Sequence, residues 1–328
     1  MTPTRELRKL SLPRSTIREE VLVNPGNRYL EYISATGEMI RLPNVIREFD
    51  PTWEDLPTPA RDTVIVERNN VTYAVGNAAK HQSGSKSAFD KGKLNLLSTS
   101  IFAALEPTCG CSSYRIENLK IAVPDTRNSE AKAKCQDLVG TFEYIRNGEQ
   151  FIVTIAKVTL IEEATAAYTY GITHGLYQWT DAINGVIDFG GGTSSGRLYS
   201  AEGVNLRDAS ITLPGTNALA QAIQARLLKE TGISVELSQV MDGIESGSYK
   251  IGRNGASFLT HFASCREQWI DDIRSKAAAL WQPYLADLGE VLLVGGSASL
   301  ATSLEERTKG RFKIAVNPQD TTILGMAL

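Results

Sequence analysis

The chain is poor in histidine and cysteine, has no excess of positive charge and lacks any long apolar run. Its three histidines are far apart, so they indicate no metal or catalytic cluster. Four cysteines in 328 residues are too few for a disulfide framework, and we expect reduced thiols in a cytoplasmic protein. A net charge of −3 disfavours direct binding to nucleic acid. No apolar run approaches the roughly 20 residues that span a membrane, so no membrane partner is expected.

What is present is an ordinary globular composition, with 42% hydrophobic and 22% charged residues. At roughly 100–200 residues per domain, the length predicts two domains. Residues 1–19 carry arginines but no apolar stretch, so we expect a flexible arm and no secretory signal.

The pattern of strands and helices repeats in two halves. Each half opens with strand, turn and strand and then alternates helices with strands, which is typical of a duplicated α/β fold. We expect a first domain over 20–184, to which 318–328 return, and a second domain over 185–317. Ligands in such folds bind where the strands end at their carboxyl side, so turns that follow strands are candidates for the site.

Several individual elements can be predicted. Asn69 and Asn70 lie between two strand patterns and indicate a hairpin. The polar stretch 84–92 is expected to be a mobile loop, and the β-branched stretch 151–160 to be one strand. Residues 217–229 read as an amphipathic helix. Its buried face is expected to hold Leu219, Ile223, Leu227 and Leu228.

Three glycine-containing turns each follow an apolar strand, at 24–27, 190–193 and 295–297. Glycine permits positive φ, and without a Cβ its N–H can approach a phosphate closely, so both properties are expected at 190–192. Any single turn is also explained by backbone geometry alone, but three at matching places favour one shared ligand. The candidate binding residues are Asn24, Gly26, Asn27, Arg28, Gly190, Gly191, Gly192, Thr193, Gly295, Gly296 and Ser297.

Asp188 ends the strand that precedes the second turn. A carboxylate beside bound phosphates can hold a hydrated Mg²⁺, which prefers few carboxylates and several waters. Asp188 is therefore the candidate metal ligand.

These residues resemble the superfamily of actin, heat-shock chaperones and sugar kinases, and within it the plasmid-segregation actins of the ParM type. Residues 188–193 resemble the second phosphate motif of this family, and 294–298 resemble its adenosine motif. Residues 161–168 and 317–327 resemble its two connecting segments. The resemblance covers most of 20–328. It implies an α/β, actin-like ATPase fold, with two duplicated RNase H-like domains (four subdomains) around a nucleotide cleft. The ligands that it implies are ATP or ADP, with GTP as the alternative nucleotide, together with Mg²⁺.

In ParM-type proteins the first connecting segment carries a glutamate that polarises the attacking water. By position the resemblance assigns this role to Glu163, with Glu162 as the rival, and it adds Asp188 to the catalytic residues. Without the resemblance, both glutamates are explained as acids that the helix dipole favours in a first turn.

The first phosphate motif departs from the family. The family has an aspartate at the end of the first strand and a lysine several residues later, whereas this chain has Asn24 and Glu31 at those positions. Arg28 is a nearby cation that can compensate. Phosphoryl transfer depends on positioning and charge stabilisation, so the loss of both charges should slow ATP hydrolysis.

The resemblance implies a protein that polymerises into filaments in a nucleotide-dependent way, with ATP hydrolysis driving filament turnover. Its partners would be further copies of itself and a DNA-binding adaptor protein, for plasmid or DNA segregation. Two alternatives stay open: a structural pseudo-ATPase scaffold with weak or absent hydrolysis, and a small-molecule kinase of the same superfamily.

Overall fold

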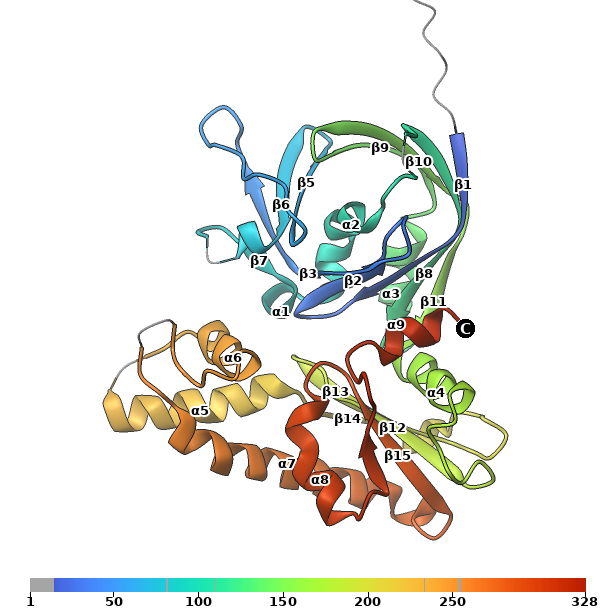
Figure 1. Cartoon of the computed structure of the whole chain (residues 1–328), viewed down its shortest axis with the longest axis vertical. Helices are drawn as coiled ribbons and strands as arrows, with labels where there is room; N and C mark the ends of the chain where they lie inside the picture. Colours follow the sequence, from blue (N-terminus) through green and yellow to red (C-terminus); the bar gives the residue numbers. More distant parts are fainter. Residues whose placement is uncertain (1–14, 81, 109, 233, 253–254) are drawn as a thin grey trace, which may run out of the picture.

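The computed structural model describes residues 15–328 except 81, 109, 233 and 253–254, and it shows two α/β domains, one above the other in Figure 1. Domain I is built on a mixed sheet in the order β3-β2-β1-β8-β10-β9-β5-β6-β4-β7, and β11 also pairs with β8. The strands are β1 (Ser15–Pro25), β2 (Tyr29–Ile33), β3 (Met39–Pro43), β4 (Val45–Phe49), β5 (Thr63–Arg68), β6 (Val71–Gly76), β7 (Lys86–Ser87), β8 (Ser113–Val123), β9 (Gly140–Arg146), β10 (Glu149–Ile155) and β11 (Val158–Glu162).

The sheet of domain I curls around helix α2 (Lys93–Ala104) (Figure 1). The curl brings β5 beside β9, where Val66 pairs with Arg146. Leu97, Ile101 and Phe102 of α2 are fully buried in the core that the curled sheet encloses. Two short helices, α1 (Ala88–Lys91) and α3 (Ser129–Gln136), complete this part of the domain.

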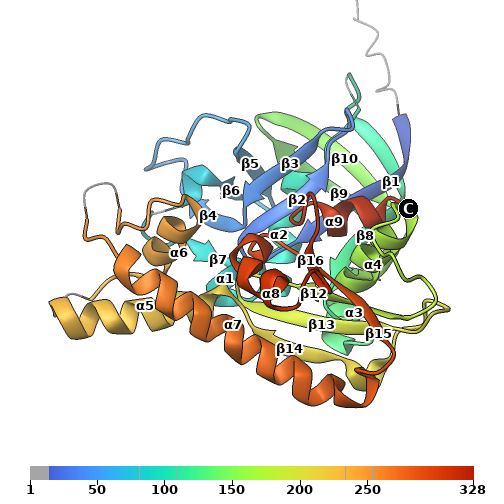
Figure 2. The same cartoon turned by 60° about the horizontal axis from the view of Figure 1, so that its bottom comes forward.

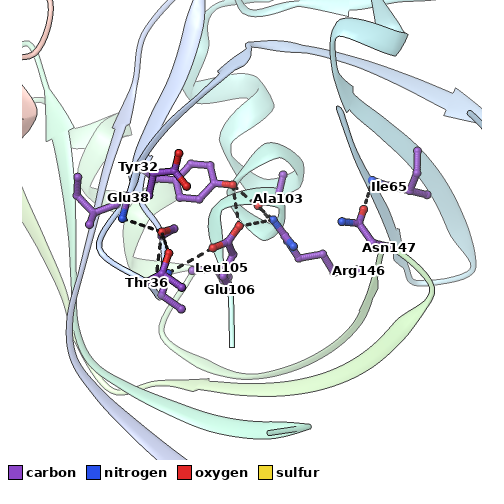
Figure 3. A network of polar contacts seen from close by, with 12 residues as sticks. Tyr32, Thr36, Glu38, Ile65, Ala103, Leu105, Glu106, Arg146 and Asn147 are labelled. Carbon is purple, nitrogen blue, oxygen red and sulfur yellow. Dashed lines mark hydrogen bonds and ion pairs between the residues drawn. The ribbon is translucent and has the colours of Figure 1, made fainter. Parts of the chain in front are cut away.

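A polar network holds the curled sheet together at the end of α2 (Figure 3). The Glu106 carboxylate accepts a hydrogen bond from the Tyr32 hydroxyl at 3.0 Å and one from Arg146 Nη2 at 2.6 Å. Arg146 also donates from Nε to the Ala103 carbonyl at 3.2 Å. Because Tyr32 lies in β2 and Arg146 in β9, the carboxylate joins two strands that are not neighbours in the sheet.

Domain II contains a five-stranded sheet in the order β14-β13-β12-β15-β16. Its elements are α4 (Glu163–Thr173), β12 (Ile183–Asp188), β13 (Thr193–Tyr199), β14 (Ile211–Pro214), α5 (Thr216–Thr231), α6 (Leu237–Glu245), α7 (Leu259–Trp281), β15 (Leu288–Val294), α8 (Thr302–Arg307) and β16 (Phe312–Ile314). Side chains alternate across β12: Ile187 faces the core formed with α5 and α7, and Val186 faces α4. Figure 2 shows α7 running along the domain beside β14.

The polypeptide crosses between the domains twice. Helix α4 packs on the sheet of domain II through Ala164, Ala167 and Tyr168, so the first crossing lies at the end of β11. After β16 the chain returns, and α9 (Thr321–Met326) packs on the sheet of domain I. We therefore place the first crossing at residues 162–163, earlier than the predicted boundary at 184–185, because the buried face of α4 belongs to the second core.

Several predicted elements differ from the structure. Strand β1 already begins at Ser15, inside the expected arm, because it pairs with the long β8; residues 1–14 lie outside the described residues. The stretch 84–92 contains β7 and α1. The stretch 151–160 belongs to two strands, since β10 and β11 pair with successive parts of one edge of β8. In α5, Leu228 is exposed, whereas the other three apolar residues predicted for the buried face are buried.

The predicted hairpin is confirmed. Asn69 and Asn70 connect β5 to β6 with φ values of 53° and 62°, the left-handed pair that a two-residue hairpin requires. Cys111, Cys135 and Cys265 are buried free thiols, and Cys109 lies outside the described residues. No helix in the described part of the chain is both long enough and apolar enough to cross a membrane.

Candidate functional site

A cavity of about 340 Å³ lies between the two domains, and we call it the cleft. Residues from both domains line it, including parts of all three predicted turns. The predicted site residues that line it are Asn24, Gly26, Asn27, Arg28, Glu163, Asp188, Gly190, Gly191, Thr193, Gly295, Gly296 and Ser297. Gly192 is not among the lining residues. A Cβ placed on it would lie 2.7 Å from Nδ2 of Asn27, so it makes the close contact between the first and second turns.

The second turn joins β12 to β13, and its glycines are needed for close packing. A Cβ on Gly190 would lie 2.3 Å from the Thr193 carbonyl oxygen. The expectation of positive φ at 190–192 is wrong, because none of these glycines has it. The N–H of Asn217, at the start of α5, donates to the Gly191 carbonyl oxygen at 2.8 Å, and this hydrogen bond fixes the turn against α5. The turn is thus a fixed, half-buried stretch of backbone that lines the cleft at Gly190 and Gly191.

The third turn follows β15 and lies directly beside the second, because β12 and β15 are parallel neighbours in which Asp188 pairs with Val294. Gly295 has a φ of 90°, and a Cβ on it would lie 2.2 Å from Oδ1 of Asp188. The Gly295 N–H donates to the Pro318 carbonyl at 2.7 Å, which ties the turn to the second crossing. Only glycine satisfies both the backbone angle and the contact with the carboxylate.

The two glutamates of the first connecting segment are placed differently. Glu162 is only 4% exposed, and its Oε1 lies 2.8 Å from Arg207 Nη1 and 3.6 Å from Arg197 Nε, both in domain II. Glu163 begins α4, lines the cleft and forms an ion pair with Lys93. The geometry thus favours Glu163 over Glu162 for contact with a ligand.

Asp188 stands in an acidic part of the cleft. Its pKa is raised to about 7, first by burial and then by the nearby Glu163 and Glu31 carboxylates, and Lys93 counteracts this shift only in part. A bound cation would therefore stabilise the ionised carboxylate. Within the described residues no group of three or more His, Cys, Asp or Glu could hold a metal by itself. The arrangement fits Mg²⁺, which binds through one or two carboxylates, waters and substrate phosphates.

The two residues that depart from the first phosphate motif, Asn24 and Glu31, contact each other. Asn24 Nδ2 donates to Glu31 Oε2 at 2.9 Å, across a pair of facing residues in β1 and β2. Arg41 Nε lies 3.1 Å from the other Glu31 oxygen, and Gln319 Nε2 donates to that oxygen at 3.3 Å. Burial raises the pKa of Glu31, while Arg41 and these amide donors lower it. Glu31 does line the cleft, but Arg41 offsets its charge.

Arg28 does not take the place of the missing lysine in this structure. Its guanidinium bonds to Asp242 at 2.8 Å and also to Glu245, both in α6 of domain II. Lys80 of domain I reaches the same Asp242 carboxylate at 2.9 Å. Arg28 thus belongs to a set of ion pairs that join the domains at the rim of the cleft.

Sequence reasoning missed Lys93, Arg41 and the acids of α6. Lys93 directly follows the polar stretch 84–92, which the sequence predicts to be a loop. The signal available in the sequence was the apolar helical pattern that begins at Leu94, which makes Lys93 a helix-start residue. Its position at the cleft depends on how the sheet curls, and the pattern does not contain that information.

No protein-family model matches the chain, and no curated protein matches its sequence. Solved structures do match its fold. Ta0583, an archaeal actin homolog, superposes with a TM-score of 0.76 at 14% identity over 94% of this chain and 98% of its own. Its complex with ADP gives 0.73 at 14% identity, with the same coverage. A 15-stranded ParM filament from Clostridium botulinum gives 0.72 at 15% identity, over 94% of this chain and 97% of that chain. The chain therefore has the actin-like fold.

Proposed function

We propose that this protein binds ATP with Mg²⁺ in the cleft, hydrolyses it slowly and assembles with copies of itself in the cytoplasm in a nucleotide-dependent way. The observation that carries the proposal is the meeting of Glu163, Asp188 and two glycine turns in one cavity between two actin-like domains. The resemblance to ParM-type proteins extends the proposal to filaments that act in plasmid or DNA segregation through a DNA-binding adaptor.

The binding step uses the backbone of the turns. The backbone of the second turn and the Thr193 hydroxyl would contact the β- and γ-phosphates, and the first turn faces the second through Asn27. Gly295, Gly296 and Ser297 would hold the adenosine end. Mg²⁺, when bound, would neutralise phosphate charge, and Asp188 would hold it through water. GTP is a further possible ligand of the same turns.

The hydrolytic step uses Glu163. Its carboxylate accepts a hydrogen bond from a water molecule and orients the oxygen for in-line attack on the γ-phosphorus. A bond forms between the water oxygen and phosphorus as the bond to the bridging oxygen of ADP breaks, and the water proton leaves toward Glu163 or the released phosphate. Because Asn24 and Glu31 replace an aspartate and a lysine, we expect slow turnover.

The loop between β4 and β5 supports self-assembly because it presents an exposed aromatic side chain. Trp53 is 87% exposed. The turn beneath it is ordered: the Trp53 N–H donates to the Asp50 carbonyl at 3.0 Å, and Glu54 forms an ion pair with Arg47. A rigid, exposed tryptophan loses little conformational entropy on binding and is typical of contact centres.

The experiment combines sedimentation with phosphate release, using purified protein with ATP, ADP, a non-hydrolysable ATP analogue or no nucleotide. Polymer that forms with ATP and decays as phosphate appears supports the proposal. Polymer in every condition without phosphate release would replace it with a structural scaffold. Transfer of phosphate to a small molecule without polymer would replace it with a kinase.

Trp53→Ala should raise the protein concentration needed for assembly and leave thermal unfolding unchanged, and Trp53→Phe should have a smaller effect.

A further inference from the structure

Lys93 is a basic residue of the cleft that none of the predicted motifs contains. It is the first residue of α2, directly after Gly92, whose φ is 85°. Its side chain is only 13% exposed, although it is a lysine, and it lines the same cavity as Glu163, Asp188 and the second turn. Lysine is rarely so well buried without a partner or a function.

Lys93 and Arg28 are the two basic residues among those that line the cleft. Arg28 is already bonded to two carboxylates of α6, and Arg41 near the cleft is bonded to Glu31 and Asp320. Lys93 forms an ion pair with Glu163. An ammonium group has three N–H donors, so it can hold Glu163 and still donate to a ligand.

The charge in the cleft requires such a donor. Four carboxylates line the cavity, from Glu31, Glu163, Asp188 and Glu245, against the two basic side chains. A nucleoside triphosphate would add several negative charges, of which one Mg²⁺ offsets two. Lys93 is paired with Glu163 and lines the same cavity as Asp188. It is therefore the cation best placed to stabilise phosphate charge beside Glu163 and Asp188.

We propose that Lys93 donates hydrogen bonds to the terminal phosphate of a bound nucleoside triphosphate while it positions the Glu163 carboxylate, and so replaces the cation that is missing where Glu31 stands. This inference rests on the proposed function, because it concerns the same cleft. Lys93 thereby distinguishes a triphosphate from a diphosphate. It also connects the γ-phosphate to the start of α2, and so to the core of domain I.

The test compares the affinities for Mg²⁺–ADP and for a non-hydrolysable Mg²⁺–ATP analogue, measured by calorimetry on the full chain. The variants are Lys93→Met, Lys93→Gln and Lys93→Arg. Lys91→Met, which removes an exposed lysine two residues earlier, is the matched control. We expect Lys93→Met and Lys93→Gln to weaken binding of the analogue at least about tenfold, and binding of ADP less than about threefold. Lys93→Arg should restore part of the difference, and Lys91→Met should match the wild type.

Each other outcome has a distinct meaning. Equal weakening of both ligands would overturn the γ-phosphate contact, and so would unchanged binding of the analogue, which would leave Lys93 as a partner of Glu163 alone. If the wild-type protein binds neither nucleotide, the proposed function itself fails, and this inference fails with it. Thermal unfolding of each variant distinguishes a lost contact from a lost fold, and the Gln and Arg variants keep the comparison decisive if Lys93→Met does not fold.

Discussion

Glu162 and Glu163 are adjacent in the chain, but their carboxylates bond to opposite domains: Glu162 of β11 to Arg207 of domain II, and Glu163 of α4 to Lys93 of domain I. At the first crossing, the last residue of domain I is therefore bonded to domain II, and the first residue of α4 is bonded back to domain I.

This arrangement predicts different results for two matched variants. Glu163→Gln should slow phosphate release by about 100-fold or more and keep nucleotide binding, because it removes the group that orients the water. Glu162→Gln should lower the free energy of unfolding by about 3 kcal/mol, because it leaves Arg197 with an uncompensated buried charge. Phosphate release and urea unfolding, measured on both proteins, check the prediction. Slower hydrolysis in Glu162→Gln at unchanged stability would reverse the assignment.

The contact between Asn24 and Glu31 predicts that an aspartate at position 24 is not tolerated without a second change. Asn24→Asp should be destabilising by about 1–3 kcal/mol, since it places two carboxylates at hydrogen-bond distance in a buried site. The double variant Asn24→Asp/Glu31→Gln exchanges the acid and the amide and should regain most of this loss. Urea unfolding of the wild type, both single variants and the double variant gives the coupling energy. A coupling energy near zero would contradict the contact.

The ion pairs of Asp242 with Arg28 and Lys80 join the two domains at the rim of the cleft. Asp242→Asn should therefore speed nucleotide release about fivefold, because pairs of this exposure are worth roughly 1 kcal/mol. Stopped-flow measurement of a fluorescent ADP analogue checks the rate. The effect should shrink at high salt, which screens such pairs. Asp272→Asn, which removes an exposed acid from α7, is the control. Equal release rates in the two variants would refute the role of the rim contacts.

Gly295 predicts a result that separates backbone strain from steric contact. Both Gly295→Ala and Gly37→Ala place an alanine where the backbone has a positive φ, and this strain costs roughly 1 kcal/mol of stability. A Cβ at position 37 meets nothing within 4 Å, whereas one at position 295 meets Asp188. Gly295→Ala should therefore be the less stable variant and should lose nucleotide affinity, which Gly37→Ala keeps. Unfolding curves and calorimetry would show a similar loss in both proteins if strain alone mattered.

The sequence was sufficient to predict the duplicated α/β plan and the turns, because these depend on local chemistry. Glycine after an apolar strand indicates where a strand ends and where a ligand can approach. The reason for the glycine at 192 was not accessible, since the close approach of Asn27 is a tertiary contact. The partners of Arg28 and Lys93 could not be predicted either, because they lie in α6 and α4, which are far away in the chain.

The division of 151–160 into β10 and β11 likewise depends on pairing. Both segments are β-branched and read as one strand, and only the length of β8 shows that its edge must serve both. Helix α6 escaped prediction as well, although it supplies Asp242 and Glu245 to the rim of the cleft.

Helices α4 and α9 meet where the two crossings lie side by side, and a Cβ on Gly325 would be only 1.9 Å from the Ala166 carbonyl oxygen. Backbones in such close contact leave little room to slide, so the domains can turn about this point more easily than they can separate. The loop between β4 and β5 lies on the far side of domain I from this pivot (Figure 1). Because this loop is far from the pivot, any turn of domain I against domain II would displace the surface that carries Trp53 more than the residues beside the pivot.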